Sequence, residues 1–88
     1  MKIVFSDQAW DDYQDWLAND SKTLERLNSL IEECRRTPFG GTGKPEALKG
    51  DLQGWWSRRL NREDRLVYRV EGKGGDQRLE IAQCRFHY

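Results

Sequence analysis

Residues 56–68 read WSRRLNREDRLVY, two short runs joined by the turn-like segment 61–64. A second turn, residues 71–77 with three glycines, leads to a further run over residues 78–86. Two successive hairpins predict a three-stranded antiparallel meander. The β-branched and aromatic run at residues 2–5 is suited to an additional strand of the same sheet.

The strand expected at residues 65–70 has two distinct faces, because successive side chains of a strand point to opposite sides. Leu66 and Tyr68 share an apolar face, which we expect to meet the helices of the domain. Arg65 and Arg69 share the other face and therefore point away from the core.

The two flanking strands extend these faces. Along residues 55–60, Arg59 shares its face with Ser57 and lies opposite to three others: Trp56, Arg58 and Leu60. The last strand alternates in two sets, which are Gln83, Arg85 and His87 against Ala82, Cys84 and Phe86. We expect a register that gathers Arg59, Arg65 and His87 on one open face of the sheet.

Two helices are expected before the meander. Ser6 can cap a first helix that ends near Asn19 and carries large side chains at helical spacing: Trp10, Tyr13, Trp16 and Leu17. Asp20 or Ser21 can cap a second helix that Pro38 ends and whose apolar positions form one stripe: Leu24, Leu27, Leu30, Ile31 and Cys34. The sequence therefore predicts an α+β fold, with two N-terminal helices packed on a twisted, mostly antiparallel four- to five-stranded sheet.

The length of 88 residues fits a single domain spanning residues 1–88. Four Trp, three Tyr and three Phe supply the bulk of a core, which excludes global disorder. No apolar run approaches the roughly 20 residues needed to cross a bilayer, and the N-terminus lacks a signal-peptide core. We expect a cytoplasmic protein with no membrane partner.

The net charge of zero conceals an asymmetry. Residues 1–34 carry three basic against eight acidic residues, a net −5, and residues 35–88 carry twelve against seven, a net +5. The excess of cations in the second part suits a polyanion such as phosphate. An ordinary solvated surface explains the same pattern, and charge alone leaves both interpretations open.

A metal or cofactor site is not expected. The single histidine and the two distant cysteines, Cys34 and Cys84, match no zinc-ligand spacing, and we expect both thiols to be reduced and buried. The pair Gly43–Lys44 is followed by Pro45 rather than by Ser or Thr, which excludes a phosphate-binding P-loop.

Residues 37–54 contain both prolines and five of the eight glycines, and form a long loop. Loops of this length in a small domain are usually functional or disordered. We expect this loop to fold over the open face of the sheet and to bring Glu46 and Lys49 to it.

One reaction suits the polar residues of the loop, the open face and the C-terminus: metal-free cleavage of RNA by its own 2′-hydroxyl. It requires a base for the hydroxyl proton, an acid for the leaving 5′-oxygen, and cations for the charge on the phosphate oxygens. The candidates are Glu46 as the base, His87 as the acid, Arg65, Arg59 and Lys49 as the cations, and Tyr88 as a group that stacks on a base or hydrogen-bonds the phosphate. An alternative interpretation remains open. Glu46 is then an ordinary loop charge, the arginines form a solvated surface, and His87 and Tyr88 belong to a frayed C-terminus.

The run RRTPFGGTGKPEALK at residues 35–49 resembles the loop of the YoeB/Txe toxins, which belong to the RelE/ParE superfamily of toxin–antitoxin toxins. Three further segments resemble the same family in the same order: SDQAWDDY at 6–13, WSRRLNREDRLVY at 56–68 and AQCRFHY at 82–88. The resemblance implies a RelE-like fold and a ribosome-dependent endoribonuclease that cuts mRNA in the ribosomal A site and so inhibits translation.

The resemblance also implies roles and partners. It assigns the general base to Glu46, the phosphate-stabilising cation to Arg65 and the general acid to His87, with the terminal tyrosine at Tyr88 and two supporting cations, Lys49 and Arg59. The implied partners are a cognate antitoxin of the YefM/Axe kind, mRNA on the ribosome, operator DNA only through the antitoxin, and a second copy in a homodimer. A ParE-like gyrase poison and a catalytically silent, antitoxin-binding regulator remain alternative functions.

Overall fold

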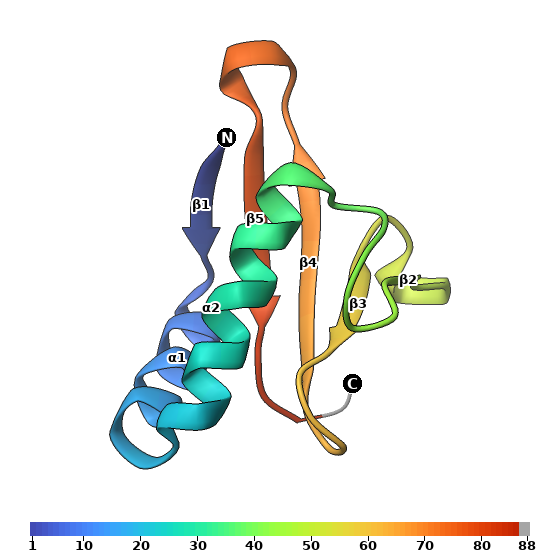
Figure 1. The fold of residues 1–88 in the computed structure, drawn as a ribbon. Coiled ribbons are helices and arrows are strands. Elements are labelled where there is room, and N and C mark those ends of the chain that lie inside the picture. Colours follow the sequence, from blue (N-terminus) through green and yellow to red (C-terminus); the bar gives the residue numbers. More distant parts are fainter. Residues whose placement is uncertain (87–88) are drawn as a thin grey trace.

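A computed structural model describes residues 1–86 of the chain. The elements follow one another as β1 (Lys2–Phe5), α1 (Asp7–Asn19), α2 (Ser21–Arg36), β2 (Glu46–Ala47), the 3₁₀ turn η1 (Gly50–Leu52), β3 (Trp56–Arg59), β4 (Arg65–Glu71), the 3₁₀ turn η2 (Gly74–Asp76) and β5 (Arg78–Gln83) (Figure 1). The order of helices and strands agrees with the sequence prediction.

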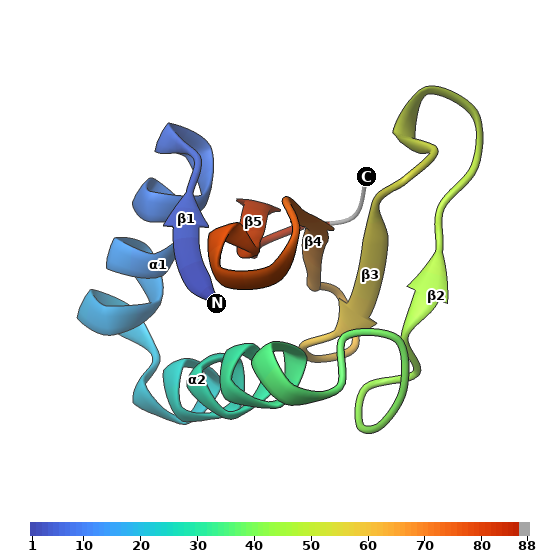
Figure 2. The same cartoon turned by 90° about the horizontal axis from the view of Figure 1, so that it is seen from above.

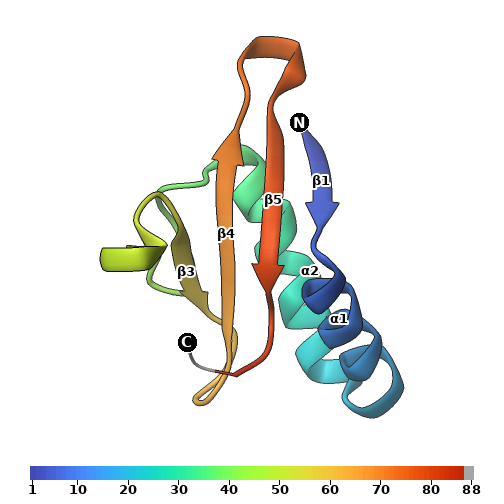
Figure 3. The same ribbon diagram turned by 180° about the vertical axis from the view of Figure 1, so that it is seen from behind.

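The sheet has five strands in the order β1-β5-β4-β3-β2. β1 pairs in parallel with β5, and the other three pairs are antiparallel. α2 crosses one face of the sheet, and α1 lies beside α2 near β1 (Figures 1 and 2). The opposite face, turned to the viewer in Figure 3, carries no helix in the described part of the chain. The predicted α+β arrangement is confirmed, and we call the helix-free side the open face.

Both predicted helix caps are present. The Ser6 hydroxyl accepts a hydrogen bond from the Ala9 amide at 3.0 Å and donates one to the Ala82 carbonyl at 2.7 Å, which ties the start of α1 to β5. Asp20 accepts the Thr23 amide at 3.1 Å at the start of α2. That hydrogen bond lowers the pKa of the Asp20 carboxyl, because it stabilises the ionised form.

The core lies between α2 and the middle of the sheet. The apolar stripe of α2 and the inner faces of β4 and β5 form one buried cluster, which includes Leu27, Leu30, Ile31, Cys34, Leu66, Tyr68, Leu79 and Ile81. This packing confirms the predicted apolar face of the middle strand and the predicted stripe on the second helix, except for Leu24, which is half-buried and outside the cluster.

α1 packs only partly as expected. Tyr13 and Trp16 pack against the core, whereas Trp10 and Leu17 are 51% and 55% exposed; the buried residues of the helix are Ala9 and Asp12. Asp12 accepts the Cys84 amide at 3.0 Å, and the Trp16 indole donates to the Cys84 carbonyl at 2.8 Å. α1 therefore turns Asp12 and Trp16 toward the chain after β5. These side chains satisfy the backbone amide and carbonyl of Cys84, which would otherwise be buried without partners.

The last strand is shorter than predicted. Tyr68 pairs with Ile81 and Val67 with Gln83, so an extra residue, Ala82, interrupts the ladder as a β-bulge. β5 ends at Gln83, and the expected alternation over residues 78–86 is wrong beyond that point. Arg85 turns to α1 and pairs with Asp15 at 2.7 Å instead of lining the open face.

Within residues 1–86, no helix combines the length and the apolar character that crossing a bilayer requires.

Candidate functional site

Strand register gathers an acidic and two basic side chains on the open face. Glu46 pairs with Ser57, and Arg59 pairs with Arg65. Directly paired residues of antiparallel strands point to the same side, and residues two apart in a strand do so about 7 Å from each other. Glu46, Ser57, Arg59 and Arg65 therefore form one patch over β2, β3 and β4, which we call the open-face cluster.

The rim of this cluster is polar and its floor is closed. Glu46 and Arg59 are exposed and Arg65 is half-buried, whereas Ser57 and Val67 are only 3% and 2% exposed. Arg65 donates to the carbonyls of Asn61 at 3.1 Å and Asp64 at 3.0 Å, which hold its guanidinium at the start of β4. The cluster therefore combines exposed charged side chains with a guanidinium held in place by backbone carbonyls.

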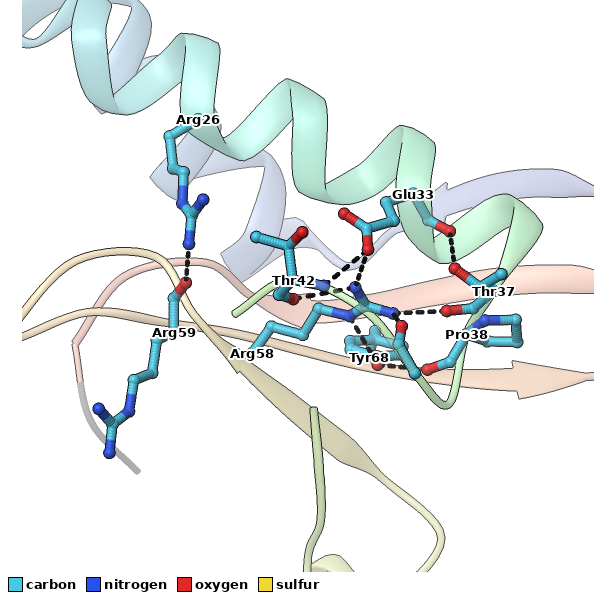
Figure 4. Close-up of polar contacts among 9 residues, drawn as sticks. Arg26, Glu33, Thr37, Pro38, Thr42, Arg58, Arg59 and Tyr68 are labelled. Atoms are coloured by element: carbon cyan, nitrogen blue, oxygen red, sulfur yellow. Dashed lines mark hydrogen bonds and ion pairs between the residues drawn. The ribbon is translucent and has the colours of Figure 1, made fainter. Parts of the chain in front are cut away.

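The basic residues of the open face differ in how far they are neutralised. Arg69 pairs with Glu80 at 2.7 Å and stacks on the Trp55 ring at 4.3 Å from its centroid. Hydrogen bonds from Arg78 and Arg69 lower the pKa of the Glu80 carboxyl. Arg59, by contrast, makes no side-chain hydrogen bond or ion pair with any described residue, and Figure 4 shows its guanidinium pointing away from α2. Its charge is available to a ligand.

Three predicted site residues are not placed in the cluster by the strand register. Lys49 is exposed and lies beyond the last β2–β3 ladder pair, at the start of η1. His87 and Tyr88 lie outside the described residues, so the expected position of His87 on the open face is not tested. The chain before them reaches the cluster, because the Phe86 carbonyl accepts the Arg65 amide at 3.2 Å.

The loop reaches the open face by another route than the one expected. Residues 46 and 47 extend the sheet as the edge strand β2, and the Leu48 amide donates to the Trp55 carbonyl at 2.9 Å. Residues 37–44 lie at the C-terminal end of α2 (Figure 2). Residues 37–44 therefore do not cover the open face, and Glu46 reaches that face through pairing with Ser57.

Arg58, which was not among the candidate site residues, is a buried arginine that fixes the first half of the loop. The Arg58 side chain is fully buried and donates to the carbonyls of Thr37 at 2.6 Å, Gly40 at 2.8 Å and Thr42 at 3.0 Å (Figure 4). Its Nη1 also lies 3.4 Å from the Glu33 carboxylate. Strand alternation predicts that Arg58 lies on the apolar face of β3. A charged side chain buried on that face requires polar partners.

Glu33 and Tyr68 complete this network. Glu33 accepts the Thr42 amide at 2.6 Å, and this hydrogen bond, with the nearby Arg58, lowers the pKa of its carboxyl. The Tyr68 hydroxyl accepts from Arg58 Nε at 3.1 Å and donates to the Pro38 carbonyl at 2.5 Å, and burial raises the pKa of Tyr68 to about 12. A side chain at Gly41 would collide with the Glu33 carboxylate, and its φ of +103° favours glycine. We call Glu33, Thr42, Arg58 and Tyr68 the loop anchor.

The two cysteines are free and buried, as expected. Burial raises the pKa of the Cys34 thiol to about 11 and that of the Cys84 thiol to about 12. In residues 1–86 no three His, Cys, Asp or Glu side chains gather as metal ligands.

Comparison with known proteins shows similarity over the whole chain. A family model described as the YoeB-like toxin of bacterial type II toxin–antitoxin systems matches residues 5–88. Toxin YoeB of Escherichia coli strain K12 is 50% identical over 88 residues, which are 100% of both chains. Toxin YoeB of a Synechocystis strain is 51% identical over 88 residues, which cover 100% of this chain and 98% of the relative.

Solved structures agree with the sequence comparison. A YoeB/ParE toxin from Agrobacterium tumefaciens superposes with a TM-score of 0.97 at 56% identity, with 100% of both chains covered. A YoeB dimer from Staphylococcus aureus gives 0.88 at 43% identity, and a heterotetrameric YoeB–YefM complex from the same organism gives 0.87 at 43%; each covers 100% of this chain and 98% of the other. The chain therefore belongs to the YoeB-like toxins of bacterial type II toxin–antitoxin systems.

Proposed function

We propose that this toxin is a ribosome-dependent endoribonuclease that cleaves mRNA in the ribosomal A site, without a metal ion, by attack of the RNA 2′-hydroxyl. The observation that carries the proposal is the register that puts the Glu46 carboxylate on the same face as Arg59 and Arg65. A base and two cations on one exposed surface suit a substrate that is already presented by a larger particle.

The reaction divides between these groups. A base removes the 2′-hydroxyl proton, the 2′-oxygen bonds to phosphorus, and the bond to the 5′-oxygen breaks as an acid protonates that oxygen. The products are a 2′,3′-cyclic phosphate and a 5′-hydroxyl. Negative charge that builds on the phosphate oxygens is stabilised by fixed cations, the usual role of arginine beside phosphate.

Glu46 is the proposed base and Arg65 the proposed phosphate-binding cation. Within the described residues the Glu46 carboxylate has no hydrogen-bond or ion-pair partner, so it is free to accept a proton. Arg65 is held by two carbonyls, which pre-orients its charge. Arg59 adds a second cation opposite it in the ladder.

The remaining roles come from the family resemblance. His87 is the proposed acid, Tyr88 the group that contacts the base or phosphate, and Lys49 a further cation for the RNA backbone. An imidazole suits the acid because its ordinary pKa of about 6.5 leaves part of it protonated near neutrality.

The proposed protein partners are inferred from those of related toxins. The Staphylococcus aureus relative occurs in a complex with YefM and as a dimer. We propose an antitoxin of the same kind for this chain, a homodimer as a second assembly, and operator DNA contacts made only through the antitoxin. The site of action is the cytoplasm, where translating ribosomes are found.

The decisive experiment adds purified toxin to one defined mRNA, free and on programmed ribosomes, and maps the ends. We expect cuts only on ribosomes, within the A-site codon, with a cyclic phosphate or 3′-phosphate end. Folded toxin that cuts neither form of the mRNA contradicts the proposal. DNA damage in cells that express it would then indicate a gyrase poison, and antitoxin binding without toxicity a silent regulator.

A matched pair of variants tests the assigned base. Glu46→Ala should lose cleavage and toxicity while still folding and binding antitoxin. Asp51→Ala removes an exposed carboxylate from the same loop and should leave cleavage unchanged. Equal activity of the two variants would remove Glu46 from the mechanism.

A further inference from the structure

The turn between β3 and β4 holds a buried carboxylate. Asp64 is only 8% exposed, which is uncommon for a carboxylate unless it is paired. Its Oδ1 accepts the Phe86 amide at 2.6 Å. Its own amide donates to the Asn61 side chain at 2.8 Å, and its carbonyl accepts the Leu60 amide at 3.0 Å. The Asp64 carboxylate is therefore held in a fixed position. It binds the backbone amide of Phe86, in the segment that follows β5.

Phe86 is held by its backbone rather than by its ring. The side chain is 59% exposed, and φ is +64°, a left-handed conformation that is unfavourable for residues other than glycine. Two hydrogen bonds fix this conformation: the amide donates to Asp64, and the carbonyl accepts the Arg65 amide at 3.2 Å. Asp64, at the end of the turn, and Arg65, at the start of β4, thus bind the backbone amide and the backbone carbonyl of Phe86.

The segment before Phe86 is fixed from the other side. α1 holds both backbone groups of Cys84, through Asp12 at 3.0 Å and Trp16 at 2.8 Å. The Arg85 guanidinium lies 2.7 Å from the Asp15 carboxylate. Residues 84–86 are therefore bound between α1 and the β3–β4 turn, although the sheet ladder ended at Gln83.

We propose that Asp64 is a positioning residue: by holding Phe86 beside Arg65, it fixes the point from which the chain leads on to the proposed acid, His87. The peptide bond to His87 begins at the carbonyl that the Arg65 amide holds. Asp64 and Arg65 are neighbours in sequence, so the same short segment carries the proposed phosphate-binding cation and holds the backbone of Phe86. For its effect on catalysis this inference rests on the function proposed above; the clamp on Phe86 stands apart from it.

The test compares Asp64→Ala with Asp64→Asn and with Glu63→Ala. The asparagine side-chain oxygen can accept the same amide hydrogen, so this variant should retain the clamp. Glu63 is exposed in the same turn, its carboxylate has no partner among the described residues, and its loss is the matched control for charge. Each variant is examined by the ¹⁵N heteronuclear NOE of Phe86 and by the single-turnover rate on programmed ribosomes.

In Asp64→Ala we expect the NOE value of Phe86 to fall and the cleavage rate at saturating ribosomes to drop about 100-fold, the effect of a misplacement of about 1 Å. Ribosome affinity should stay unchanged, because no group that contacts the substrate is removed. Asp64→Asn and Glu63→Ala should behave as the wild type in both measurements.

Unchanged NOE values in Asp64→Ala, or an equal loss in Asp64→Asn, would overturn the proposal. Hydrogen exchange of the Phe86 amide in the wild type needs no variant: protection supports the clamp, and exchange at the rate of a free peptide overturns it. A wild type that fails to cut ribosomal mRNA defeats the proposed function alone, since the NOE and exchange experiments do not use the ribosome.

Discussion

Arg58 Nε donates a hydrogen bond of 3.1 Å to the Tyr68 hydroxyl, which joins β3 to β4 on the side of the sheet that α2 covers. The same hydroxyl donates onward to the Pro38 carbonyl, and the same guanidinium donates to three further loop carbonyls. A pair of core side chains thus shapes the loop that carries Glu46. The loop anchor holds residues 37–42 on the side of the sheet that α2 covers, whereas Glu46 is placed on the open face by its pairing with Ser57.

Arg58→Lys should destabilise the protein strongly. A lysine ammonium cannot reproduce the planar set of donors that reaches three carbonyls and the Tyr68 hydroxyl. A buried acceptor left without a donor costs about 1–3 kcal/mol, so we expect the free energy of unfolding to fall by about 3 kcal/mol. Urea unfolding measures this change. Arg36→Lys, at the exposed end of α2, is the control. A similar loss of unfolding free energy in both variants would mean that the hydrogen bonds of Arg58 contribute no additional stability.

Tyr68→Phe removes a single hydroxyl from the same anchor. Arg58 Nε and the Pro38 carbonyl both lose a partner, and we expect a loss of about 1–3 kcal/mol in the free energy of unfolding. In the double variant with Arg58→Lys the losses should be less than additive, because the two residues share one network. Strict additivity in urea unfolding would show that they act independently.

Glu33→Gln should make stability less dependent on acid pH. The pKa of the Glu33 carboxyl is lowered in the folded protein by the Thr42 amide and by Arg58. Its stabilising contribution is therefore complete above the unfolded value of about 4.3 and is lost as the pH falls through the lower folded value. The melting temperature of the wild type should exceed that of Glu33→Gln at pH 6–7, and the difference should shrink below about pH 4. Glu25→Gln, an exposed position on α2, should show no such convergence.

Arg59→Gln should weaken catalysis without changing stability. The Arg59 guanidinium makes no side-chain bond within residues 1–86, so its removal leaves no internal partner unpaired. Loss of one charge-stabilising donor lowers a rate by about 100- to 1000-fold, and we expect a fall of that size in cleavage on ribosomes. Arg62→Gln in the neighbouring turn serves as the control for net charge. An unchanged cleavage rate in Arg59→Gln would exclude its proposed contact with the RNA.

Neither thiol should react in the folded protein. Burial raises the pKa of Cys34 to about 11 and that of Cys84 to about 12, so almost no thiolate forms at pH 8. Titration with a disulfide reagent at pH 8 should modify both residues only after guanidinium is added. Modification of one thiol per native molecule, at the rate of a free cysteine, would contradict this prediction.

The parts of the fold that depend on local pattern were predictable from the sequence. The α2 stripe follows from helical spacing, the helix caps from Ser6 and Asp20, and the two hairpins from alternation interrupted by turns. The placement of Arg59 and Arg65 on one face also followed from strand alternation, and the structure adds that the two residues pair directly.

The parts that depend on distant hydrogen-bond partners were not predictable. The exposure of Trp10 and Leu17 results from Asp12 facing Cys84, a contact across 72 residues. The bulge at Ala82 and the role of Arg58 likewise depend on partners elsewhere in the chain. For the open-face cluster, the sequence identified Glu46, Arg59 and Arg65, but only the β2–β3 pairing explains how Glu46 reaches the other two.

The parallel pairing of β1 with β5 constrains the order in which the protein can fold. Ser6 bonds to Ala82, 76 residues further along the chain, and β5 lies between β1 and β4 in the sheet. Contacts between such distant segments form slowly, because a long stretch of chain must first be ordered. A nascent chain therefore cannot close its sheet until β5 has left the exit tunnel. Because β1 is synthesised first and its partner β5 last, the complete five-stranded sheet forms only after nearly all of residues 1–86 have been made.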